Sequence, residues 1–234
     1  MDNDEKWSVI AVQRRLVAQL LDGLDEDQWE RRSLCTEWRV KDVAAHLALT
    51  PQSPGILRIV AAGFRARGDF DAVNRDLAKA HAVCPPAELV AELRELADSR
   101  RKPAITTLDN LLFDTLVHVQ DVAIPLGLTA TMPLEAACEG VDRVWRMGWP
   151  FWARRRLRGL RLIATDVDWS AGEGAEIRGP VQALLLLLTG RTGAALLYLS
   201  GSGVERLTEA EGRPRWHPRR AGRSAGVRRG RPVR

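Results

Sequence analysis

The 234-residue sequence predicts an α+β protein with a helical bundle, a small α+β module and a disordered Arg-rich tail. Apolar residues recur at helical spacing through the first part of the chain. Alternation typical of strands begins only after Arg158, and residues 213–234 hold nine arginines and no acidic residue. We therefore expect a helical bundle over 1–155, the small module over 156–208 and the tail over 209–234.

The first helices of the bundle follow from apolar stripes. This pattern predicts helices over Trp7–Leu24, 38–49, 54–68, 73–82 and 85–102. The region 54–82 is expected to be shorter and less regular, because Gly63 and Gly68 interrupt it. The segment 85–102 opens with prolines that suit a first helical turn.

Two further helices complete the bundle. Residues 106–127 have Thr or Asp at their start and Pro125 and Gly127 at their end, which are standard stop signals. The next helix is expected from 133 until Pro150. Four aromatic residues near its end are expected to pack a junction: Trp145, Trp149, Phe151 and Trp152.

The module is read from short elements. Residues 159–169 alternate like a strand, residues 175–179 resemble a second strand, and residues 179–190 resemble a buried helix between glycines. The stretch 193–207 leaves two alternatives open, a helix that ends in a short strand or a longer pair of strands.

Charge and composition limit the classes of function. With 45% hydrophobic residues, the chain can bury a core. Its net charge of +5 comes from the tail, because nine of the 35 basic residues lie there and leave 26 against 30 acidic residues. The tail can touch phosphates or anionic lipid non-specifically, and we expect no specific nucleic-acid partner.

The sequence indicates a cytoplasmic protein that does not enter a membrane. It begins with a polar, acidic stretch, and its longest apolar run, "VQALLLLL", is shorter than the about 20 residues that span a bilayer. Cys35, Cys84 and Cys138 lack metal-type spacing, so we expect reduced, mostly buried thiols and assign none of them as a nucleophile. We expect a monomer.

Asp114 and His118 lie four residues apart in the apolar run "NLLFDTLVHVQD". On a helix this spacing puts both side chains on one face, where they can reach a common ion. His46 lies on another apolar stripe and is the best-placed third ligand, whereas His81 lies in a polar segment. The spacing alone leaves open that His46 and His118 are hydrogen-bonded core histidines with Asp114 as a partner.

Two quoted motifs resemble a known family. "SLCTEWRVKDVAAHLA" and "LLFDTLVHVQDVAIPLG", with the later "LLLLLTGR", are similar to the mycothiol-dependent maleylpyruvate isomerase family of the DinB-like superfamily. The resemblance implies a DinB-like four-helix bundle, a divalent metal that is usually zinc, and mycothiol as thiol cofactor. It implies His46, Asp114 and His118 as metal ligands and Arg191 as a functional arginine. An arginine can clamp a substrate carboxylate, although a helix-end role for Arg191 accounts for its position equally well.

The sequence departs from the family at two positions. The acid at 114 is usually Glu, and Asp is shorter by one CH₂, or roughly 1.3 Å, which is large against the ±0.2 Å tolerance of metal distances. Arg39 stands where Ser or Thr would cap a helix, at a cost of about 1 kcal/mol. Asp121 can orient His118, although local hydrogen bonding near the helix end is slightly favoured.

These features predict an enzyme that activates mycothiol for addition to a small, electrophilic and anionic substrate. It would act as an isomerase of the maleylpyruvate type or as a thiol transferase. The alternative is a non-catalytic relative that binds a metal or a ligand. A third reading, a nucleic-acid-associated protein, depends on the arginine tail alone.

Overall fold

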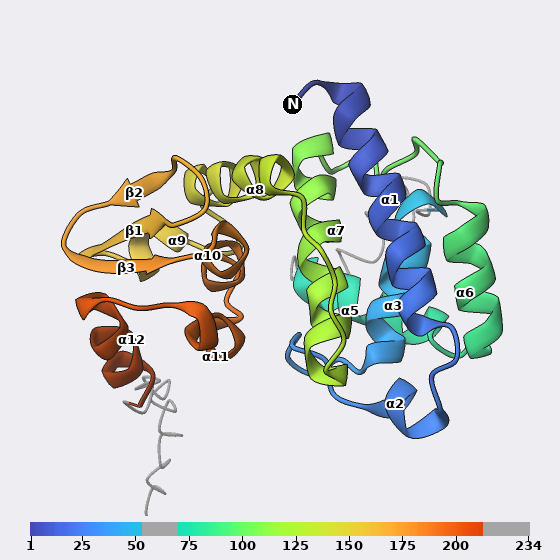
Figure 1. The fold of residues 1–234 in the computed structure, drawn as a ribbon. Helices are drawn as coiled ribbons and strands as arrows, with labels where there is room; N and C mark the ends of the chain where they lie inside the picture. The colour runs from blue at the N-terminus through green and yellow to red at the C-terminus, as the bar shows by residue number, and fades with distance from the viewer. Residues whose placement is uncertain (53–69, 213–234) are drawn as a thin grey trace, which may run out of the picture.

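The computed structural model describes residues 1–52 and 70–212 and confirms the predicted fold class. A helical bundle and a smaller module with a three-stranded sheet lie side by side (Figure 1). The predicted helical segment 54–68 lies outside the described residues, as do residues 213–234 of the predicted tail. Residues 209–212, which were expected to belong to that tail, instead end helix α12 (Ser202–Gly212). Among the described residues, no helix combines the length and hydropathy needed to cross a membrane.

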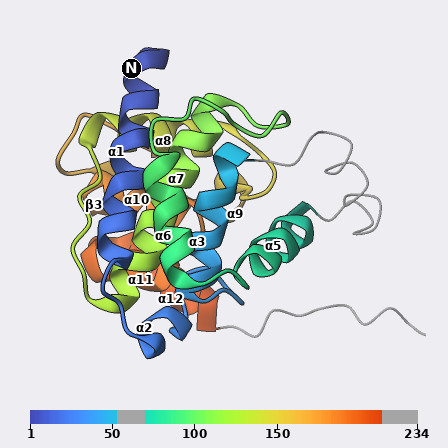
Figure 2. The same ribbon diagram turned by 90° about the vertical axis from the view of Figure 1, so that its right-hand side faces the viewer.

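Among the described residues, four helices form the bundle: α1 (Asn3–Leu21), α3 (Val40–Leu49), α6 (Pro86–Glu95) and α7 (Leu108–Ala123). Helix α1 packs along α6 and α7, and α3 packs against the same two helices. Helix α5 (Phe70–His81) lies outside the bundle against α3 (Figure 2). A short helix, α2 (Glu26–Glu30), falls in a stretch that the sequence analysis left without structure.

The ends of α7 follow the signals in the sequence. Thr107 caps the start of α7, because its hydroxyl accepts a hydrogen bond from the backbone N–H of Asn110 at 3.1 Å. After α7 a single 3₁₀ turn, η2 (Ile124–Leu126), leads into Gly127. Gly127 has φ of 69°, a left-handed conformation that glycine adopts without the strain of a Cβ atom.

Arg39 precedes α3 and its side chain makes no capping hydrogen bond, as expected, but Asp42 in the first turn bonds back to Arg39. Asp42 accepts the backbone N–H of Arg39 at 2.8 Å and also pairs with both ends of the Arg39 guanidinium. Burial alone would raise the pKa of Asp42, but its hydrogen bonds and ion pair with Arg39 outweigh burial and lower that pKa. The helix is therefore capped from Asp42 rather than from the residue before the helix.

The C-terminal module contains three strands within a set of short helices. Strand β1 pairs antiparallel with β2 and parallel with β3, so the sheet has the order β2-β1-β3. Residues 193–207 are mainly helical, so the first of the two alternatives holds there. The short strand expected after the helix is reduced to one bridge between Arg178 and Ser200. The elements that follow α7 and η2 in the chain are α8 (Leu134–Arg146), α9 (Ala153–Arg156), β1 (Leu160–Ala164), β2 (Ser170–Gly172), β3 (Ala175–Gly179), α10 (Val181–Leu188), α11 (Thr192–Ala195), η3 (Leu196–Tyr198) and α12 (Ser202–Gly212).

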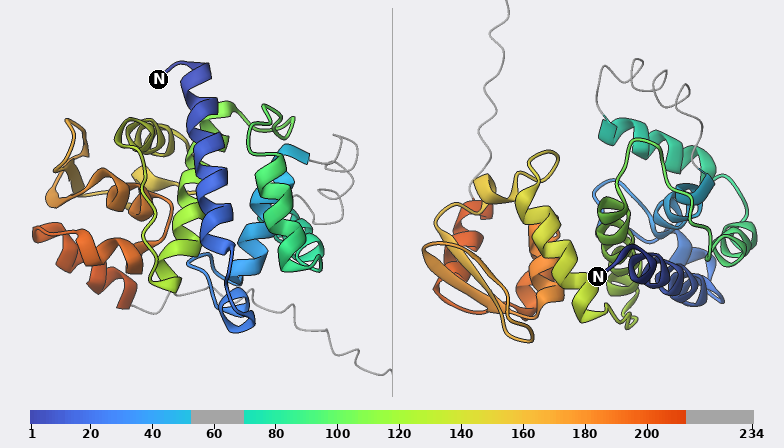
Figure 3. Two further views of the ribbon diagram at one scale, coloured as in Figure 1. Left: turned by 45° about the vertical axis from the view of Figure 1, so that its right-hand side comes forward. Right: turned by 90° about the horizontal axis from the view of Figure 1, so that it is seen from above.

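Helix α7 is shared between two apolar cores. The last turns of α7, with Val119 and Val122, belong to the core of the bundle. The first half of the helix, with Leu112 and Leu116, belongs to a core that continues through α8 and α10 to the sheet. Figure 3 shows α7 facing the module. This second core includes residues on both sides of position 155 and fixes the module against the bundle.

The aromatic cluster near residue 150 packs only in part. Phe151 meets Phe113 of α7 edge to face, with ring centroids 5.9 Å apart, and Trp145 packs against the second core. The prediction was wrong for Trp149 and Trp152, whose exposed fractions are 54% and 53%.

Candidate metal centre

His46, Asp114 and His118 converge on one point between α3 and α7. His46 comes from the last turn of α3, and the other two lie one turn apart on α7. The Nε2 atom of His46 is 3.2 Å from one Asp114 oxygen, and the Nε2 atom of His118 is 3.4 Å from the other. One ligand atom from each residue lies within 4.8 Å of the others, the one such group in the described residues.

These residues fit a divalent ion. Ligand atoms about 2.0–2.2 Å from a tetrahedral zinc ion are roughly 3.3–3.5 Å apart. The two separations, each to a different Asp114 oxygen, are close to that distance. The shorter Asp114 side chain therefore reaches both imidazoles. Three protein ligands leave one tetrahedral position open. The Asp114 side chain is 31% exposed, so solvent reaches the cluster.

Trp38 holds both imidazoles from one side. Its ring lies parallel to that of His118, with centroids 5.8 Å apart and an angle of 3° between the planes. The same ring meets the His46 ring edge to face at 5.3 Å. Trp38 itself is buried, and it precedes α3 in the loop that leads from α2. The ring fixes the direction in which both Nε2 atoms point.

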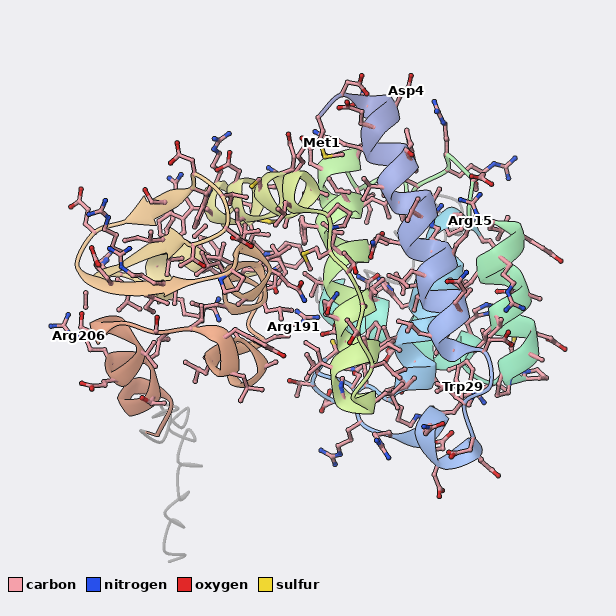
Figure 4. All side chains as sticks on the ribbon, viewed as in Figure 1. Met1, Asp4, Arg15, Trp29, Arg191 and Arg206 are labelled. Atoms are coloured by element: carbon pink, nitrogen blue, oxygen red, sulfur yellow. The ribbon has the colours of Figure 1, made fainter. Side chains whose placement is uncertain are left out.

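A buried carboxylate links His118 to the C-terminal module. The side chain of Asp121 is fully buried and lies 2.8 Å from Nδ1 of His118. The guanidinium of Arg191 donates two hydrogen bonds to the same carboxylate, from Nε at 3.0 Å and from Nη2 at 2.6 Å. Figure 4 shows Arg191 between the module and α7. Among the neutral tautomers, an acceptor at Nδ1 favours the one with its lone pair on Nε2, which is the form that could bind a metal ion.

Arg191 is positioned by the turn that follows α10. Gly190 adopts a φ of 88°, and the Nη1 group of Arg191 donates to the carbonyl of Thr189 at 2.8 Å. Three of its five N–H groups are thus engaged within the protein, and two remain for another acceptor. The sequence indicated an arginine at this position but not its bond to Asp121.

The electrostatics of the cluster favour a positive charge beside each carboxylate. Burial alone would lower the pKa of His118, but Asp114 and then Asp121 outweigh it and raise that pKa to about 9. Burial would likewise raise the pKa of both acids. His118 and His46 instead hold the pKa of Asp114 well below its usual range, and Arg191 and His118 lower that of Asp121. A divalent cation satisfies the same preference for positive charge.

The contact between the loop before α3 and helix α7 was not predicted from the sequence. The backbone N–H of Leu34 donates to the carbonyl of Asp121 at 3.3 Å, which attaches this loop to α7. The tryptophan in "TEWRV" was visible in the sequence, but its contact with two histidines depends on how this loop folds back. The contact between Asp121 and His118 has the i, i+3 spacing and was visible.

Comparisons with known proteins were made for the whole chain. Residues 10–105 match the family model of the mycothiol maleylpyruvate isomerase N-terminal domain, a segment that contains His46 and ends before Asp114. No match is found among the curated protein sequences.

Two solved structures share the fold over most of this chain. One is the crystal structure of the mycothiol-dependent maleylpyruvate isomerase, which is 15% identical with a TM-score of 0.58. The other is a histidine-to-alanine mutant of the mycothiol-dependent maleylpyruvate isomerase, with 14% identity and a TM-score of 0.57. Each match covers 87% of this chain and 94% of the other chain.

Proposed function

We propose that this chain is a metal- and thiol-dependent enzyme, a proposal supported by the match of residues 10–105 to the model of the mycothiol maleylpyruvate isomerase N-terminal domain. Its thiol is mycothiol or a similar small thiol, and its substrate is small, electrophilic and anionic. The reaction is an isomerisation of the maleylpyruvate type or a thiol transfer. The observation that carries this proposal is the convergence of His46, Asp114 and His118 on one partly exposed point. We expect the protein to act as a monomer in the cytoplasm, where small thiols stay reduced.

The proposed metal ligands are the two Nε2 atoms and the Asp114 carboxylate. Two imidazoles and a carboxylate with one open position are typical of catalytic rather than structural zinc sites. A bound divalent ion supplies Lewis acidity that keeps a thiol sulfur deprotonated at neutral pH. Trp38 and Asp121 hold the two imidazoles in place, which lowers the cost of organising the site when an ion binds.

Arg191 is the proposed contact for the anionic group of the substrate. Its Nε and Nη2 groups hold Asp121, so the two remaining N–H groups can donate to a carboxylate. This places a fixed positive charge near the cluster, on the far side of Asp121. The chemistry that a thiol offers to an activated cis alkene is addition, rotation about the new single bond and elimination, which returns the thiol and gives the trans isomer.

Metal content is the first test of the proposal. Protein purified anaerobically with zinc supplied is expected to hold about one ion per chain by elemental analysis, as a three-ligand site predicts. His46→Ala, Asp114→Asn and His118→Ala should each lose it. Asp109→Asn, which changes an exposed acid at the start of the same helix, is the matched control and should retain it. A wild-type protein without bound metal contradicts the proposal and favours a non-catalytic relative.

The second test concerns the reaction. Metal-loaded protein is mixed with maleylpyruvate, with and without mycothiol, and the cis and trans isomers are separated by chromatography. Trans product that needs both mycothiol and an intact Asp114 supports an isomerase. A stable thioether with an electrophilic acceptor supports a transferase instead. If neither product forms in the metal-loaded protein, the enzymatic proposal is wrong.

A further inference from the structure

A second group of reactive side chains lies outside the metal centre, where α5 turns into α6. His81 is the last residue of α5, Cys84 follows it in the turn, and Glu92 contacts His81 from the last turns of α6. The turn is fixed by a hydrogen bond from the backbone N–H of Cys84 to the carbonyl of His81 at 3.0 Å. All three residues are partly exposed.

The imidazole of His81 lies between the thiol and the carboxylate. Its Nε2 atom is 2.7 Å from Glu92, and its Nδ1 atom is 3.8 Å from the sulfur of Cys84. Gln52 donates a further hydrogen bond at 3.2 Å to the same Glu92 oxygen. A carboxylate acceptor at Nε2 keeps the imidazole proton on that nitrogen, so the lone pair of Nδ1 faces the thiol. A nucleophile, a base and a group that orients the base are thus arranged in sequence.

This arrangement does not suit a single metal ion. Cys84 and Glu92 meet opposite nitrogens of the ring, so no one ion can bind all three side chains. The group of metal ligands found among the described residues is the one at His46, Asp114 and His118. The order thiol, imidazole and carboxylate therefore points to proton transfer rather than to coordination.

Two observations support a reactive thiol at Cys84: the turn is open to small reagents, and the surroundings of Cys84 differ from those of Cys138. Cys84 is partly exposed and follows Val83, whose exposed fraction is 81%, so a small reagent can approach the turn. Cys138, in contrast, has its pKa raised by burial and by surrounding acids, which include Asp166 and Asp142. A thiol in such a place is a poor nucleophile because the thiolate is the reactive form.

We propose that Cys84 is a reactive cysteine that exchanges with low-molecular-weight disulfides, with His81 as its base and Glu92 as the positioning residue. Nδ1 of His81 takes the proton from the Cys84 thiol, and the sulfur attacks one sulfur of the disulfide R–S–S–R. The S–S bond of the reagent breaks, the bond Cys84 S–S–R forms, and the departing thiolate receives the proton from His81. The sulfur of Cys84 is formally oxidised by one electron and the leaving sulfur is reduced by one, so the exchange needs no further oxidant.

The test uses the full chain with Cys35→Ser and Cys138→Ser, which leaves Cys84 as its one thiol. Glutathione disulfide is added at pH 7, and the mixed disulfide is followed by intact mass. An ordinary thiol is only a few per cent thiolate at this pH, so His81→Asn and Glu92→Gln are each expected to slow the reaction by about 10-fold. The matched control keeps Cys138 alone, with Cys35→Ser and Cys84→Ser, and should react at least about 10-fold more slowly.

A spectroscopic readout separates positioning from mere packing. The ¹⁵N shifts of the His81 ring are expected to show a proton on Nε2 and none on Nδ1, and Glu92→Gln should weaken this preference while circular dichroism shows an intact fold. Equal rates for Cys84 and Cys138, or an Nδ1-protonated ring, would overturn the proposal. The rates of disulfide exchange at Cys84 are expected to be the same in a His46→Ala background. A negative result for Cys84 would therefore say nothing against the proposed metal centre.

Discussion

Replacing Asp121 with asparagine is the sharpest test of how the metal centre is held. Asp121→Asn keeps the size of the side chain but removes its charge. In the folded protein this carboxylate accepts from His118 at 2.8 Å and twice from Arg191, at 3.0 and 2.6 Å. The asparagine amide has one acceptor oxygen in place of two, and its NH₂ group would face an N–H donor of His118 or Arg191. The variant therefore leaves the guanidinium without its anion.

The expected loss of stability is large because neither partner is solvated. The side chain of Asp121 is fully buried and that of Arg191 is 11% exposed. Removing one partner of a buried ion pair costs about 3–5 kcal/mol, since the other charge remains in the interior. For a chain of this length each kcal/mol shifts Tm by about 2–4 °C, so a fall of roughly 10 °C is expected. Metal affinity should fall by about 10–100-fold, as for other groups that orient a metal-binding histidine.

Two measurements check these values. Calorimetry of the metal-free proteins gives the difference in Tm, and competition with a chromophoric chelator gives zinc affinity. The double variant Asp121→Asn with Arg191→Met should recover part of the stability, because the uncompensated charge is gone, but none of the metal affinity. A fall in Tm below about 2 °C would show that Arg191 finds another partner at little cost, and the reasoning from burial would be wrong.

Two further predictions concern the fold. Asp42→Asn should destabilise the protein by about 1–3 kcal/mol at pH 7. Because Arg39 lowers the pKa of Asp42, the ionised Asp42 stabilises the fold above the unfolded pKa near 3.9, and this stabilisation is lost as pH falls below about 4. Urea unfolding should therefore show a smaller difference in stability between wild type and variant at pH 3 than at pH 7. Gly179→Ala would place a Cβ atom 2.6 Å from the carbonyl oxygen of Tyr198 and should cost about 1–3 kcal/mol in urea unfolding. Gly193→Ala, with no atom within 4 Å, is its control, and an equal loss there would exclude the steric explanation.

The convergence of the three candidate ligands could be predicted because it depends largely on spacing within helices. The i, i+4 relation of Asp114 and His118 fixes their common face, and the apolar stripe around His46 directs that residue inward. The resemblance to a family supplied the pairing of the two helices, which spacing alone left open.

The remaining contacts of the site depend on how loops and the module fold back on α7. Trp38 reaches both histidines because the loop before α3 is bonded to the last turn of α7. The exposure of Trp149 and Trp152 depends similarly on the turn between α8 and α9, where Trp152 takes a left-handed conformation. No periodicity encodes these turns, and short apolar runs such as 193–207 fit helix and strand equally well.

The bond between Asp121 and Arg191 connects the C-terminal module to the candidate metal centre. Asp121 faces inward from the last turn of α7, and within the described residues its counter-charge comes from the turn after α10. A bundle without the module would carry a buried carboxylate beside His118 with no arginine to balance it, a costly state that favours protonation of the acid and release of the histidine. The second core joins α7 to α8 and α10 and so holds Arg191 next to Asp121. We therefore expect the bundle and the module to unfold together when the bond is intact.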